Sequence, residues 1–71
     1  MTIQKMHELA KTNKYYRICN KGNFVGICHA KMIGIILRLG RVNPNSIVNY
    51  SYRESNINEY VTFNKGYGLL N

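Results

Sequence analysis

The most apolar part of the chain is residues 29–40, HAKMIGIILRLG, and this run is the only one that can seed a hydrophobic core. At roughly 100° per residue, its few polar positions fall on one narrow side of a helix and the rest is apolar. That polar side holds Lys31, Gly34, Arg38 and the following Arg41. The pattern predicts a helix that ends at Gly40, the usual left-handed cap residue, and that the rest of the chain must cover on most of its circumference.

A shorter amphipathic helix is predicted near the N-terminus, where apolar side chains recur every three or four positions. Thr2 is a good N-cap and Asn13 favours a stop, so this helix is expected to run to about residue 12. Its inner stripe consists of Ile3, Met6, Leu9 and Ala10. A helix this short needs another surface to pack against.

Between these two helices, apolar residues recur at every second position, which is typical of strands. Residues 15–19 and 24–28 flank Asn20-Lys21-Gly22-Asn23, a hairpin turn signal. A regular ladder closed by Lys21-Gly22 pairs Ile18 with Val25 and Tyr16 with Ile27 on one face. The opposite face is then expected to carry Tyr15, Arg17, Cys19, Phe24 and Cys28.

A second hairpin is expected in the last third of the chain. Pro44 and the asparagines around it predict a loop over residues 41–45. Alternation over residues 47–53 and 57–64 predicts two strands joined around residues 54–56. The glycine-rich residues 65–71 are expected to be a flexible tail.

These elements predict an α+β fold in the order αββαββ. The simplest packing is a two-layer sandwich, in which a mainly antiparallel four-stranded sheet has both helices on one face and its other face open to solvent. Residues 1–71 are expected to form a single small domain. In an alternative arrangement, the second hairpin is a wing beside the helical pair, as in winged DNA-binding domains.

The charge of the chain indicates an anionic partner. Ten Lys and Arg face three Glu, so the net charge is +7, and a positive surface field follows on so small a body. The absence of a cleavable leader, of a cysteine framework and of an apolar run of roughly 18 residues predicts a cytoplasmic protein without a membrane segment. The abundance of Asn, Ile, Lys and Tyr is typical of AT-rich genomes and suggests a phage or a mobile element. A homodimer is left open, because a chain of 71 residues has little core of its own.

Catalysis, metals and cofactors are not expected. The three glutamates are far apart in sequence and there is no aspartate, so no paired carboxylates are predicted. Cys28 and His29 are strand neighbours that point to opposite faces, and the spacing between Cys19 and Cys28 suits neither a zinc site nor a disulfide. The motif Lys65-Gly66-Tyr67-Gly68 lacks the length and the following helix of a phosphate-binding loop.

Aromatic and basic residues together suggest the function. On the face expected to be open lie Tyr15, Arg17, Phe24, Arg53 and Tyr60, with Lys14, Lys21 and Lys65 around them. Rings on a sheet can stack on bases while cations meet phosphates. The leading hypothesis is a non-enzymatic accessory protein that binds DNA or RNA. Its predicted interface is Tyr15, Arg17, Lys21, Phe24, Lys31, Arg38, Arg41, Arg53 and Tyr60.

A protein partner is the alternative interpretation. Exposed tyrosines and arginines are common anchors of protein interfaces, so the same residues would serve a small interaction module or inhibitor. Its positive face would then dock on an acidic surface of a host enzyme or complex. Binding that survives nuclease treatment would distinguish this alternative from nucleic-acid binding.

Overall fold

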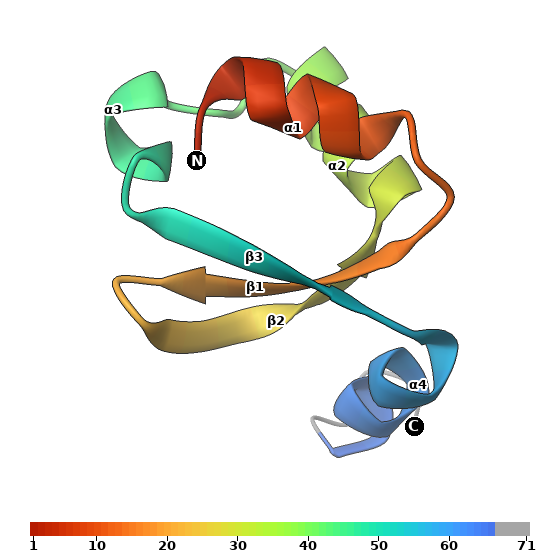
Figure 1. Cartoon of the computed structure of the whole chain (residues 1–71). Coiled ribbons are helices and arrows are strands. Elements are labelled where there is room, and N and C mark those ends of the chain that lie inside the picture. The colour runs from red at the N-terminus through yellow and green to blue at the C-terminus, as the bar shows by residue number, and fades with distance from the viewer. Residues whose placement is uncertain (67–71) are drawn as a thin grey trace.

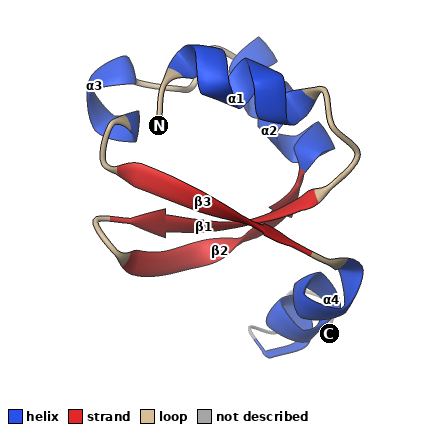
Figure 2. Cartoon of the chain, viewed as in Figure 1, coloured by secondary structure: helices blue, strands red, loops and turns tan. Residues whose placement is uncertain are grey.

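A computed structural model describes the backbone of residues 1–66 and the side chains of residues 1–64, and it is an α+β fold built on one antiparallel sheet (Figure 1). In chain order the elements are α1 (Ile3–Ala10), β1 (Tyr15–Asn20), β2 (Asn23–His29), α2 (Ala30–Arg38), α3 (Pro44–Ile47), β3 (Tyr50–Ser55) and α4 (Ile57–Gly66). The strand order of the three-stranded sheet is β2-β1-β3. Helices α1 and α2 lie above the sheet and α4 lies below it (Figure 2), so we call these two sides the upper and lower faces.

The last element differs most from the sequence-based prediction, because residues 57–64 belong to helix α4 and not to a strand. Asn56 caps the helix, with its Oδ1 accepting a hydrogen bond from the backbone N–H of Glu59 at 2.9 Å. The Glu59 carboxylate in turn accepts a hydrogen bond from Ser55 Oγ at 2.6 Å. The prediction of a four-stranded sheet in αββαββ order was therefore wrong for the described residues. Residues 65 and 66 continue α4, and the rest of the predicted tail lies outside the described chain.

The first hairpin has the predicted loop but a different register. Lys21 and Gly22 both have positive φ angles, of 51° and 82°, as a two-residue hairpin loop requires. A bulge then shifts the ladder, because Cys19 pairs with Phe24 whereas Ile18 pairs with Gly26. Val25 is the extra residue, and it is 53% exposed.

The bulge changes which residues share a face. Tyr16 lies opposite Cys28, and Arg17 lies opposite Ile27. The predicted pairs of Ile18 with Val25 and Tyr16 with Ile27 were therefore wrong. As a result, Cys28 joins Tyr16 on the upper face, where it packs against the core.

Both long helices of the upper layer begin with a side-chain cap, and the cap predicted at Thr2 is confirmed. Thr2 Oγ1 accepts a hydrogen bond from the backbone N–H of Lys5 at 3.0 Å at the start of α1. His29 caps α2 through Nδ1, which accepts a hydrogen bond from Lys31 N–H at 3.0 Å. Gly40 follows α2 with a φ of 67°, so the predicted left-handed cap is confirmed.

The core lies between α1, α2 and the upper face of the sheet. Leu9, Tyr16, Ala30 and Ile33 are each 5% exposed or less. Gly34 was predicted on the polar side of α2, but a Cβ atom there would lie 3.7 Å from Ala10 Cβ. Gly34 therefore faces α1, and a Cβ atom at this position would be in ordinary van der Waals contact with Ala10.

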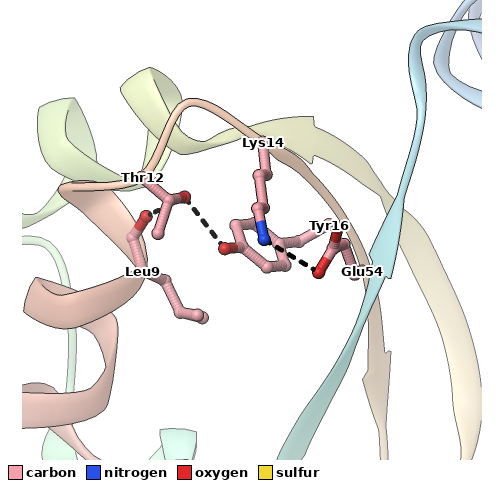
Figure 3. A network of polar contacts seen from close by, with 5 residues as sticks. All are labelled: Leu9, Thr12, Lys14, Tyr16 and Glu54. Atoms are coloured by element: carbon pink, nitrogen blue, oxygen red, sulfur yellow. Dashed lines mark hydrogen bonds and ion pairs between the residues drawn. The ribbon is translucent and has the colours of Figure 1, made fainter.

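A hydroxyl pair closes the core at the end of α1 (Figure 3). Thr12 Oγ1 donates to the carbonyl oxygen of Leu9 at 2.8 Å and lies 2.8 Å from the hydroxyl of buried Tyr16. Because a threonine hydroxyl has a single hydrogen, Tyr16 is the donor to Thr12. Nearby, Lys14 Nζ and Glu54 Oε2 form an ion pair at 3.3 Å, which connects the loop after α1 to β3.

Pro44 begins a helix in the segment that was predicted to be a loop. Proline has no N–H to lose at the first helical position, and Asn43 Oδ1 accepts a hydrogen bond from the backbone N–H of Asn45 at 2.9 Å. The resulting short helix α3 includes Ile47, which is 9% exposed. For this reason β3 starts at Tyr50 and not at residue 47.

Candidate functional site

Helix α4 covers part of the lower face, which the sequence analysis expected to be open. Tyr60 of α4 packs on Tyr15 with ring centroids 5.0 Å apart, and Phe63 meets Phe24 edge-on at 5.5 Å. Phe63 also closes over the backbone of β2, where a Cβ atom on Gly26 would lie 3.2 Å from its ring. The expectation that helices shield only one side of the sheet was therefore wrong.

The three predicted stacking residues belong to two separate pairs of rings, and both pairs join α4 to the sheet. Tyr15 contacts Tyr60 and, at 4.8 Å, the ring of His29. Phe24 contacts Phe63 and carries the guanidinium of Arg17 4.1 Å from its ring centroid. Tyr15, Phe24 and Tyr60 are all half-buried. These rings hold α4 against the sheet, and this structural role weakens the case for base stacking.

Two arginines remain side by side on the lower face. Arg17 of β1 and Arg53 of β3 are directly opposite in the antiparallel register, a placement that brings Cβ atoms within roughly 4.5–5.5 Å. Arg17 is half-buried and Arg53 is exposed. Like charges in opposite positions destabilise a sheet unless something compensates them.

No carboxylate within the described residues forms an ion pair with either arginine. The ion pairs there join Lys5 to Glu8 at 3.8 Å and Lys14 to Glu54 at 3.3 Å. Glu59 lines the same hollow of about 460 Å³ as Arg17, but its carboxylate receives the hydroxyl of Ser55. Among the described residues the arginine pair therefore has no ion-pair partner, although Glu59 contributes a negative charge to the hollow that Arg17 lines.

The remaining predicted site residues lie elsewhere. Lys21 lies in the loop at the end of the β1–β2 hairpin, whereas Lys31 and Arg38 belong to α2 above the sheet and Arg41 follows that helix (Figure 1). The structure places Arg17 next to Phe24 and opposite Arg53, and it places Tyr15 next to Tyr60. Of the three cations of the α2 segment, Lys31 lines a hollow together with Tyr15 and Tyr60, whereas Arg41 lines a different hollow.

The titratable groups of the described chain show two shifts. Burial raises the pKa of the Cys28 thiol, and a hydrogen bond with Tyr52, followed by the charges of Tyr52 and Glu8, raises the pKa of Lys5. Cys28 faces the core while His29 contacts Tyr15, which confirms that these neighbours point in opposite directions. Both cysteines are free thiols.

Residues 1–66 contain neither a cluster of metal-ligating side chains nor a membrane-spanning helix. No three side chains of the His, Cys or Glu type gather there in a way that suits a metal ion. None of the helices in the same part of the chain combines the length and the apolarity that a bilayer requires.

Neither the packing of α4 on the sheet nor the opposition of Arg17 to Arg53 was predicted from the sequence. The signal for α4 was the spacing of Asn56 and Glu59, which is an N-cap followed by an acidic residue in the first turn. The position of β3 beside β1 follows no local signal. Comparison with known proteins finds no family model that matches the chain and no similar curated protein or solved structure.

Proposed function

We propose that this protein binds nucleic acid by its phosphate backbone, at the part of the lower face that α4 leaves uncovered. The observation that carries this proposal is the cross-strand pair of Arg17 and Arg53 without a carboxylate partner. A guanidinium group presents a planar fork of donors that fits phosphate oxygens. A phosphate that bridges the pair would also remove the repulsion between the two arginines.

The setting of each arginine supports this role. The guanidinium of Arg17 lies over Phe24, so fewer of its rotamers must be frozen when a phosphate binds. Exposed Arg53 lies opposite it in the ladder, so two guanidinium groups can meet one phosphate. This proposal is narrower than the sequence-based hypothesis, because Tyr15, Phe24 and Tyr60 hold α4 and are not assigned to bases.

Binding should show little preference for nucleotide sequence, and its affinity should fall steeply as the salt concentration rises. Each phosphate contact contributes roughly 0.7–0.9 to the slope of the logarithm of the binding constant against the logarithm of salt concentration. Two contacts, from Arg17 and Arg53, therefore predict a slope of about −1.4 to −1.8. Fluorescence anisotropy of labelled duplex DNA and single-stranded RNA, titrated at several salt concentrations, measures this quantity.

Arg53→Glu is the informative variant. It removes one phosphate contact and places a carboxylate opposite Arg17. We therefore expect affinity to fall about tenfold and the salt dependence to become less steep, with the magnitude of the slope lower by about 1. Lys11→Glu is the matched control, because it changes the net charge equally at an exposed position beside α1. An equal loss in both variants, or no binding at low salt, would refute the proposal.

A further inference from the structure

One side of α2 exposes an apolar stripe that the described chain does not cover. Met32, Ile35 and Leu39 are 48%, 41% and 59% exposed. Their spacing of three and four residues places them in one line along the helix. The sequence predicts that most of the circumference of α2 is covered, and this stripe is where that prediction fails.

Two hollows border the stripe and meet at the edge strand β2. The hollow between α2 and α4, about 490 Å³, is lined by Met32, Ile35 and Tyr60. The hollow beside α1 and α3, about 480 Å³, is lined by Ile36 and Ile47. Both hollows share Ile27 and Cys28 of β2. The stripe and the hollows therefore form one apolar, uneven surface, which we call the α2 side.

The charges around the α2 side have a single sign. Lys31 lines one hollow and Arg41 the other, while Arg38 lies next to Ile35 on the helix surface. None of the described residues lining either hollow is acidic. Lys31, Arg38 and Arg41 form no ion pair with the described carboxylates.

We infer that the α2 side docks an amphipathic helix of another protein, with an apolar stripe flanked by Asp or Glu. Such a helix would fill the hollows with its apolar side chains and pair its acids with the three cations. An added strand suits the site less well, because the bulge at Val25 interrupts the edge of β2. A second copy of the chain is disfavoured, since a two-fold axis would set Lys31 and Arg38 against the same cations.

The direct probe is a synthetic acidic amphipathic peptide of about 18 residues, with leucines at helical spacing and flanking glutamates. Anisotropy of the labelled peptide should give a dissociation constant of about 10–100 μM with the intact protein. The same peptide with lysine in place of glutamate should bind at least about tenfold more weakly. Failure of the acidic peptide to bind at about 1 mM would overturn the inference.

A pair of protein variants locates the site. We expect Met32→Ser combined with Leu39→Ser to weaken peptide binding at least tenfold, because both side chains are exposed parts of the stripe. Val48→Ser is the matched control, since Val48 is an exposed apolar residue, 63% exposed, at the end of α3. Equal binding by the double variant and the control would contradict the proposed location.

Other occupants give different results. A dimer in sedimentation that the double variant abolishes would identify a second copy and reject the proposed partner. Tighter binding to anionic vesicles of phosphatidylglycerol and phosphatidylcholine than to the peptide, with the same loss in the variant, would identify a lipid surface instead. Arg53→Glu should leave peptide binding unchanged while it weakens nucleic-acid binding, so the two proposals can fail separately.

Discussion

The two faces of the sheet are covered in different ways. The upper face packs against α1 and α2 through Leu9, Tyr16, Ala30 and Ile33, which are almost fully buried. The lower face is joined to α4 mainly by edge-on and tilted contacts between half-buried rings. The upper layer therefore removes more apolar surface from water, and it should contribute most of the stability.

The difference shows how a small domain divides its residues between folding and surface chemistry. Full burial of an aliphatic side chain contributes about 1.5–3 kcal/mol, whereas an aromatic pair adds about 0.5–1.5 kcal/mol beyond its buried area. Arg17 and Arg53 occupy two lower-face positions that bury little apolar surface. We therefore expect α4 to open more readily than α1 and α2.

The largest expected effect comes from truncation on each face. Ile33→Ala should lower the free energy of unfolding by about 3 kcal/mol, because Ile33 is almost completely buried and leaves a cavity. Phe63→Ala should cost about 1–2 kcal/mol, since its ring is half-buried. Urea unfolding followed by circular dichroism measures both values.

A milder variant is needed in case Ile33→Ala prevents the protein from folding. Ile33→Val should cost about 1 kcal/mol and leave a folded protein. If Phe63→Ala proved more damaging than Ile33→Ala, the ranking of the two faces would be reversed.

A smaller effect is expected where Phe63 approaches the backbone of β2. Gly26→Ala places a Cβ atom 3.2 Å from the Phe63 ring, and the required shift should cost about 1 kcal/mol. In a Phe63→Ala background the same change should be nearly neutral, because the obstructing ring is gone. Equal costs in the two backgrounds would show that the ring does not lie on β2 as described.

The smallest effect concerns pH and the upper face. Burial raises the pKa of Cys28 above its ordinary value of 9.0, so the native state keeps the proton where the unfolded chain loses it. The resulting stabilisation is complete below pH 9.0 and declines as pH rises through the raised pKa. The stability advantage of the unmodified protein over Cys28→Ala should therefore shrink at alkaline pH under reducing conditions. A difference that stays constant or grows would contradict this assignment.

Local signals account for the parts of the fold that the sequence predicts well. Thr2, Gly40 and the Lys21-Gly22 loop each specify a conformation through their own chemistry, and the structure confirms all three. The run from Tyr60 to Asn64 alternates like a strand, yet the cap at Asn56 and the packing of Tyr60 and Phe63 at helical spacing favour a helix. Period alone does not distinguish the two in so short a segment.

The sequence predicts several residues of the candidate site, but it does not predict how the strands that carry them pair. Alternation along β1 correctly places Tyr15 and Arg17 on the same face. The opposition of Arg53 to Arg17 depends on the pairing of β3 with β1, which is a contact between segments far apart in sequence. The bulge at Val25 has a local signal in Gly26, because an isolated glycine inside a strand pattern often marks a bulge.

The bulge has a consequence for the behaviour of the protein at high concentration. In the three-stranded sheet, β2 and β3 are edge strands. Edge strands can offer main-chain amides and carbonyls to a neighbouring copy, which is a common route to fibres. The bulge at Val25 breaks the even spacing of those groups along β2, and Arg53 adds a charge to β3. Stacking of copies into a continuous ribbon is thereby opposed on both sides, by misaligned hydrogen-bonding groups on one and by repulsion on the other.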